Sequence, residues 1–209
     1  MRRGRAGLVV VAVLAAAPAA GQTPSPAPGP YVVDVRAATS GVPNDVSFYP
    51  ALTTEFVPAR GFGLDLGGHV YVFTIGPARV GLGAAVMLIR SSATVPVSTE
   101  DPPQVERLIL NLRTVAPQVS FNFGSRDGWS YLSAGLGVAH VTTRTEQFAE
   151  GQRESGQLRS INFGGGARWF ITERLAFGFD VRAHKLAASA SSGTPAMTMM
   201  AINAGLSLR

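Results

Sequence analysis

Residues 200–208 read Met-Ala-Ile-Asn-Ala-Gly-Leu-Ser-Leu, so that large apolar residues alternate with small or polar ones. A period of two predicts a β-strand, because successive side chains of a strand point to opposite faces. The second face carries Ala201, Asn203, Gly205 and Ser207. These side chains are small and only weakly polar, which is typical of the inside of a barrel whose apolar face meets lipid.

The same alternation recurs along the chain and predicts eight strands. Their ranges are 31–39, 61–75, 79–91, 106–123, 129–144, 157–171, 174–188 and 195–208. Most of these segments are long enough to cross a membrane at a tilt. Short connections at 76–78, 124–128 and 172–174 alternate with longer ones at 40–60, 92–105, 145–156 and 189–194. We therefore predict an all-β fold, an eight-stranded antiparallel up-and-down transmembrane β-barrel over residues 31–209, with its short turns in the periplasm.

The predicted faces change parity within the fourth strand. The pattern places Leu108, Leu110 and Leu112 outward and Asn111 and Arg113 inward, and then places Val119, Phe121 and Phe123 outward. A change of parity requires an extra residue in the strand, so we expect a β-bulge near Pro117.

Aromatic residues gather near the short connections and predict an interfacial girdle. The members of this group are Phe73, Phe121, Phe123, Trp129, Tyr131, Trp169, Phe170 and Phe177. The alternative is ordinary ring packing in the hairpins of a soluble sheet.

The N-terminal segment has the pattern of an export signal. Arg2, Arg3 and Arg5 precede an apolar run over 8–17 that is too short to span a bilayer, so we expect a cleaved signal peptide over 1–21 and a Pro-rich spacer over 22–30. Three of the 18 basic residues lie in that signal, which leaves fifteen against 13 acidic residues, and the remaining arginines are scattered. Nucleic-acid binding is therefore not expected. The chain has no cysteine, which excludes disulfides and thiolate metal sites.

The signal, the eight alternating strands and the alternating final strand resemble small outer-membrane β-barrels of the OmpA/OmpX type over about residues 31–208. The resemblance implies a Gram-negative-type outer membrane, its lipid and the barrel-insertion machinery as surroundings and partners. We expect a monomer. The chain departs from the usual ending of such barrels, because Leu208 stands where an aromatic residue is common.

Seven polar side chains are predicted to line the lumen: Asp65, His69, Arg113, Arg168, Asp180, Arg182 and His184. An eight-stranded barrel has an interior just wide enough for side chains, so we expect these charges to pair and fill it. A gated ion path through Arg113, Arg168, Asp180 and Arg182 is the alternative. No spacing of ligands supports a metal site, and no cofactor is expected.

His140 is predicted to face outward near the loop end of its strand, with Thr142 on the same face and Glu154 among the acidic residues that follow. A histidine, a hydroxyl and a carboxylate are the groups that acyl-ester cleavage needs. The set faintly resembles outer-membrane lipid A deacylases, although those carry serine where Thr142 stands. An interfacial polar residue without catalytic function is the simpler interpretation.

These patterns favour a non-enzymatic barrel with a structural or surface-interaction role carried by its extracellular loops and with a lumen plugged by side chains. A hydrolase using His140 and Thr142 and a narrow ion-conducting pore are the alternatives. A soluble lipocalin-type carrier would need large apolar residues inside, the reverse of the pattern over 157–188. The sequence identifies no loop ligand.

Overall fold

The computed structural model describes residues 29–49, 57–96, 105–125, 127–145 and 152–209. Within these residues the chain forms nine strands and one 3₁₀ turn. The strands are β1 (Tyr31–Gly41), β2 (Arg60–Ile75), β3 (Ala78–Pro96), β4 (Val105–Ser125), β5 (Gly128–Thr145), β6 (Arg153–Glu154), β7 (Leu158–Phe170), β8 (Leu175–Leu186) and β9 (Met197–Leu208), and the turn is η1 (Val46–Phe48). All eight predicted strands are therefore present. The two-residue β6, which adds to β5, was not predicted. No helix in the described part of the chain is long and apolar enough to span a membrane.

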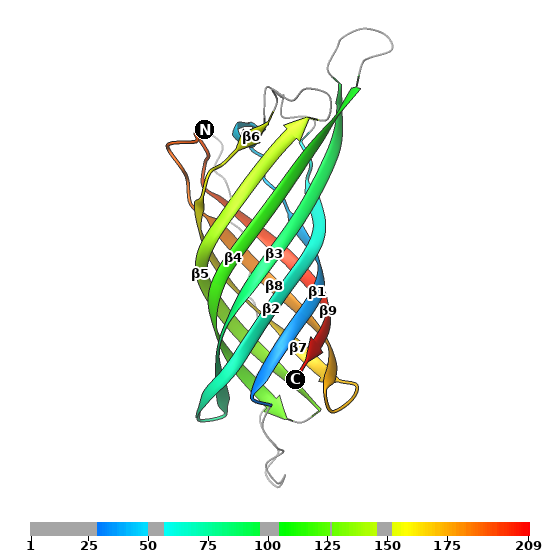
Figure 1. Cartoon of the computed structure of the whole chain (residues 1–209), viewed down its shortest axis with the longest axis vertical. Coiled ribbons are helices and arrows are strands. Elements are labelled where there is room, and N and C mark those ends of the chain that lie inside the picture. The colour runs from blue at the N-terminus through cyan, green and yellow to red at the C-terminus, as the bar shows by residue number, and fades with distance from the viewer. Residues whose placement is uncertain (1–28, 50–56, 97–104, 126, 146–151) are drawn as a thin grey trace, which may run out of the picture.

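The strands close into an eight-stranded antiparallel barrel. Each long strand pairs with its neighbour in sequence, β4 pairs with β5, and β1 pairs with β9 to complete the ring. Figure 1 shows the tilted strands, with the hairpin turns β2–β3, β4–β5 and β7–β8 at the lower end. The β2–β3 turn contains Gly76 at φ 56°, a left-handed conformation that glycine adopts without steric cost. The predicted fold class is confirmed.

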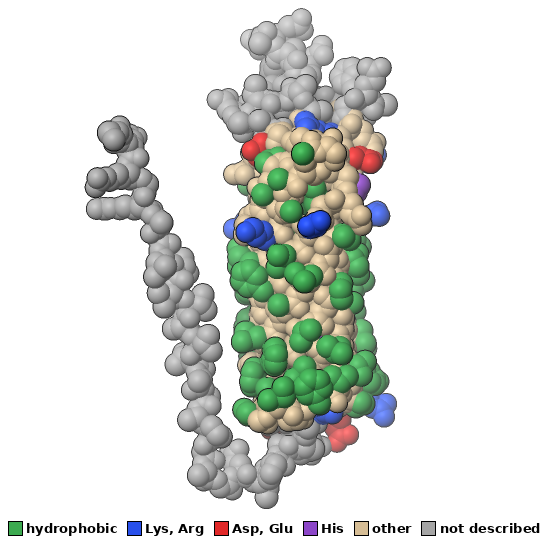
Figure 2. Space-filling view, turned by 90° about the vertical axis from the view of Figure 1, so that its left-hand side faces the viewer, with side chains coloured by type: hydrophobic (Ala, Val, Ile, Leu, Met, Phe, Trp, Pro, Cys, Tyr) green, Lys and Arg blue, Asp and Glu red, His purple; other side chains and the backbone are tan. Residues whose placement is uncertain are grey.

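An apolar band covers the outer wall toward the short-turn end. Leu64, Leu132, Phe163 and Ile202 are examples, with exposed fractions from 47% to 58%. Figure 2 shows hydrophobic side chains over this part of the wall and lysine or arginine side chains at one level above it. Thirty large apolar side chains pointing into water would be unfavourable, whereas the same wall is favourable against lipid.

The upper edge of this band is marked by basic residues on six consecutive strands. We call them the basic collar: Arg60, Arg90, Arg113, His140, Arg159 and Lys185. Each comes two residues beyond an outward apolar residue, as Arg90 follows Leu88 and Arg113 precedes Val115. Collar residues on neighbouring strands are not always direct cross-strand partners, as expected for strands that are tilted. Arg113 pairs with Leu88 and not with Arg90, and Arg159 pairs with Val138 and not with His140. In the remaining two barrel strands, Gly41 pairs with Arg60 and Thr198 pairs with Lys185.

The predicted faces of the upper half of β4 were wrong. Leu108, Leu110 and Leu112 are fully buried inside the barrel, and Arg113 points outward and is exposed. The alternation continues without a break through the buried residues Thr114, Ala116, Gln118 and Ser120. The rule that apolar residues face outward fails here because this part of β4 lies beyond the lipid band, where the apolar side chains pack inside the barrel.

The predicted bulge at Pro117 was therefore also wrong. The β3–β4 pairing runs from Arg79–Asn122 to Pro96–Val105 in one register, with Pro117 opposite Ala84. The barrel does contain an irregularity, but it lies between Tyr71 and Phe73, where β2 pairs with β3. Placing the extra residue there keeps Tyr71 inside while Phe73 lies outside.

Candidate functional site

A network of buried charges fills the middle of the lumen. The carboxylate of Asp34 accepts hydrogen bonds from Arg168 Nε at 2.9 Å and Nη2 at 2.7 Å, and from the Ser207 hydroxyl at 2.5 Å. Arg36 joins Asp34 to Asp65, with Nη2 at 2.7 Å from Asp34 Oδ2 and Nη1 at 2.9 Å from Asp65 Oδ2. All four charged side chains are at most 4% exposed, so desolvation is offset by direct pairing.

A second group of charges lies beside the first. Arg182 donates to both oxygens of Asp180, to Asn162 Oδ1 at 2.7 Å and to the Ser133 hydroxyl at 2.6 Å. Asp180 also accepts from the Tyr131 hydroxyl at 3.0 Å and from Asn203 Nδ2 at 3.1 Å. Tyr131 contacts both groups: its hydroxyl donates to Asp180, and the centroid of its ring lies 4.0 Å from the guanidinium carbon of Arg168.

The described lumen network is electrically balanced. Its carboxylates are Asp34, Asp65 and Asp180, and its cations are Arg36, Arg168 and Arg182. Three negative and three positive groups in direct contact therefore neutralise one another within this network.

The structure places most of the predicted lumen residues inside the barrel. Asp65, His69, Arg168, Asp180, Arg182 and His184 are all buried there. Arg113 is the exception, since it belongs to the basic collar on the outer wall. The sequence reasoning missed Asp34 and Arg36, although the alternation of Val33, Val35 and Ala37 around them was a sufficient signal.

The short-turn end of the lumen is closed by aromatic rings. Trp129 packs against Tyr71 at 6.0 Å between ring centroids and against Phe170 at 4.9 Å. The Arg209 guanidinium lies 3.9 Å from the centroid of the Phe170 ring. Trp129 and Tyr131 are thus inside the lumen and not in the girdle where they were predicted, because their parity on β5 is opposite to that of Leu132.

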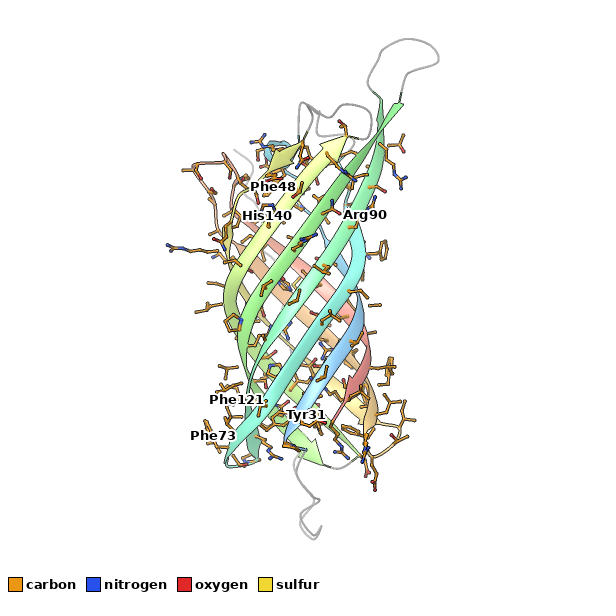
Figure 3. All side chains as sticks on the ribbon, viewed as in Figure 1. Tyr31, Phe48, Phe73, Arg90, Phe121 and His140 are labelled. Atoms are coloured by element: carbon orange, nitrogen blue, oxygen red, sulfur yellow. The ribbon has the colours of Figure 1, made fainter. Side chains whose placement is uncertain are left out.

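The remaining predicted girdle residues behave differently. Phe73, Phe121, Phe123, Trp169 and Phe177 are exposed on the outer wall, whereas Phe170 packs inward against Trp129. Figure 3 shows Tyr31, Phe73 and Phe121 together near the short-turn end, with Arg90 and His140 toward the opposite end. An aromatic lower edge and a basic upper edge therefore bound the apolar band.

The loop end of the lumen is closed by an apolar cluster. Leu108, Leu110 and Leu112 pack there with Met87, Ile89, Val141, Leu158, Leu186 and Met199. Phe48 and Tyr49, which follow β1, bury their rings in the same cluster. The Thr143 hydroxyl holds this segment by donating to Phe48 O at 2.7 Å, and the Tyr49 hydroxyl donates to Pro43 O.

The same segment carries an exposed carboxylate. Asp45 accepts hydrogen bonds from the hydroxyl and the backbone N–H of Ser47, which lower the pKa of its carboxyl group below the usual value. This local turn leads into η1 and positions Phe48 over the lumen.

The structure brings His140 and Glu154 together on the outer wall. His140 Nε2 lies 3.9 Å from Glu154 Oε2, and Nδ1 lies 3.1 Å from the carbonyl oxygen of Gly156. Thr142 pairs with Glu154 across the β5–β6 ladder. Acyl-ester cleavage needs one ring nitrogen facing the nucleophile and the other facing the acid. In the described residues both nitrogens of His140 face other groups, so the three side chains do not form that arrangement with Thr142 as nucleophile.

The described residues contain no group of three histidine, aspartate or glutamate side chains that could hold a metal ion. His69 and His184 are buried on the lumen wall and do not belong to such a group.

The comparisons with known proteins identify the fold. A scan against protein-family models found no match, and a search of curated proteins found none either. Among solved structures, Neisserial surface protein A is similar at a TM-score of 0.59 and 10% identity, covering 86% of this chain and 97% of its own. The attachment invasion locus protein Ail of Yersinia pestis gives a TM-score of 0.49 at 11% identity, covering 85% and 97%. The outer membrane protease OmpT of Escherichia coli gives 0.42 at 8% identity, covering 86% and 97%. The likeness to Neisserial surface protein A shows that the chain has the fold of a small eight-stranded β-barrel.

Proposed function

We propose that this protein is a closed, surface-exposed barrel of a Gram-negative-type outer membrane, whose function is structural or is carried by its extracellular loop end. The observation that carries the proposal is the continuous filling of the lumen. Aromatic rings close one end, the neutral charge network fills the middle, and the apolar cluster closes the other.

The two edges of the apolar band support an orientation with the loop end outside the cell. The short turns lie at the aromatic edge, and the strand ends that the longer connections join lie beyond the basic collar, which is the usual arrangement of bacterial barrels with short turns in the periplasm. The loop end and the part of the wall above the collar are then available to ligands or to neighbouring envelope components.

Orientation is testable by cysteine labelling, because the natural chain contains no cysteine. The variant Ser191→Cys places a thiol at an exposed position between β8 and β9, and Pro77→Cys places one in the β2–β3 turn. A membrane-impermeant maleimide should label Ser191→Cys in intact cells and should label Pro77→Cys only after lysis. Labelling of Pro77→Cys alone in intact cells would show the opposite orientation. Recovery of the protein in the soluble fraction would refute the membrane placement.

The closed lumen is testable in planar bilayers. The purified, refolded barrel should give no discrete conductance steps under conditions in which a general porin does. A heat-dependent shift in gel mobility of the same sample would show that the barrel is folded. Conductance from folded protein would favour the ion-path alternative.

A further inference from the structure

A groove of about 320 Å³ lies on the outer wall where β5, β7 and β8 run side by side. Leu136 and Ile161 line it, with exposed fractions of 68% and 48%. Arg159 and Lys185 of the basic collar line it as well. The groove therefore spans the boundary between the apolar band and the charged level above it.

The strand register explains the shape of the groove. Leu136, Ile161 and Lys185 form one row of cross-strand partners on the outer face. The next row contains Val138 and Arg159, and it ends at Ala187, whose backbone N–H donates to Arg159 O at 2.9 Å. Because Ala187 has only a methyl side chain, space remains between the two long basic residues.

The two cations are not neutralised by the protein residues that the structure describes. Arg159 and Lys185 are diagonal neighbours on the same face and both are exposed. Neither side chain makes an ion pair or a hydrogen bond within the described ranges. By contrast, His140 of the same collar has Glu154 beside it. Two like charges at the edge of an apolar surface favour an anion with an apolar body.

We propose that this groove binds one molecule of lipid A, with a phosphate between Arg159 and Lys185 and an acyl chain along Leu136 and Ile161. A guanidinium group can donate two hydrogen bonds to a phosphate, and an ammonium adds a point charge. The choice of lipid A rests on the proposed function, because in that orientation the collar lies at the outer leaflet, whose phosphates belong to this lipid.

The test is native mass spectrometry of the full-length exported barrel in detergent micelles with added lipid A. We expect one lipid to be retained by the natural protein. The double variant Arg159→Gln/Lys185→Gln should weaken its retention by about tenfold or more, because both attractive charges are removed. The matched control is Arg90→Gln/Arg113→Gln, which removes two exposed collar charges outside the groove and should leave retention unchanged.

A second variant tests the space itself. Ala187→Trp keeps both cations but fills the groove, and it should also reduce retention of lipid A. Equal losses from the groove and control double variants would overturn the proposal, as would unchanged retention in the groove variant. Equal retention of phosphatidylglycerol would overturn the choice of lipid A.

Failure of this proposal is distinguishable from failure of the proposed function. Each sample is first checked for a heat-dependent mobility shift, and orientation is read independently from Ser191→Cys labelling. If the barrel is folded and Ser191→Cys is labelled in intact cells, but lipid A is not selectively retained, only the proposal of lipid A binding in the groove is refuted.

Discussion

Asp34 on β1 and Arg168 on β7 face each other across the lumen, joined by hydrogen bonds of 2.9 and 2.7 Å, although 134 residues separate them. Strands β9 and β8 lie between β1 and β7 in the sheet, so this pair can form only after the barrel has closed. The same carboxylate also contacts Arg36 and Ser207. Asp34 is therefore the central hydrogen-bond acceptor of the first group of charges, which contains Arg36, Asp65 and Arg168.

Replacing Asp34 with asparagine should strongly destabilise the barrel. The variant leaves Arg36 and Arg168 buried with one fewer carboxylate, and removing one partner of a buried ion pair typically costs about 3–5 kcal/mol. The free energy of unfolding is measured by urea titration of the barrel in micelles or vesicles. Asp45→Asn serves as the control and should change stability little, because Asp45 is exposed and an asparagine Oδ1 can still accept the hydrogen bonds from Ser47. A cost for Asp34→Asn as small as that of the control would contradict a structural role for the network.

The interior position of the β4 leucines makes a separate prediction. Leu110→Ala should destabilise the barrel by about 2–5 kcal/mol, because it leaves a cavity in the apolar cluster at the loop end. Leu132→Ala is the matched control, since Leu132 is 54% exposed on the lipid-facing wall and its loss leaves no enclosed cavity. Urea titrations of both variants give the comparison. If Leu132→Ala cost as much as Leu110→Ala, the inward orientation of the upper β4 leucines would be in doubt.

Alternation was enough to predict the fold but not every face. A period of two located all eight barrel strands, because each strand within the bilayer carries large apolar residues outside and small or polar residues inside. The rule no longer applies at the collar and above it, where both faces of a strand meet protein or water. Leu110 and Arg113 were therefore assigned to the wrong sides.

The charge network shows a different limit of sequence reasoning. Parity alone places Asp65, Arg168, Asp180 and Arg182 on the inner face, and the structure has them there. The pairing of Arg168 with Asp34 depends on tilt and closure, which bring β1 and β7 opposite each other. No local pattern contains that information. The contact between His140 and Glu154 likewise depends on β6, a strand of two residues that alternation cannot identify.

His140 provides a test of the hydrolase alternative. Because its two ring nitrogens face Glu154 and Gly156, we expect His140→Asn to leave the acylation of lipid A unchanged. Lipid A is extracted from cells expressing the natural protein, the variant or an empty vector, and its acyl chains are counted by mass spectrometry. Loss of an acyl chain with the natural protein but not with His140→Asn would establish the enzyme. The heat-dependent mobility shift confirms that both proteins are folded.

Two inward-facing glycines differ in how closely another strand approaches them. A Cβ added to Gly166 on β7 would lie 2.0 Å from the carbonyl oxygen of Phe179, whereas one added to Gly67 on β2 would meet its nearest atoms at 3.7 Å. A contact of 2.0 Å cannot be relieved by rotating a side chain, because the atom belongs to the backbone of the paired strand β8. We therefore expect Gly166→Ala to lower the fraction of protein that refolds into the heat-modifiable form, and Gly67→Ala to fold like the natural chain. Since both substitutions add one methyl group inside the same lumen, equal folding yields would mean that the barrel wall can shift to accept it.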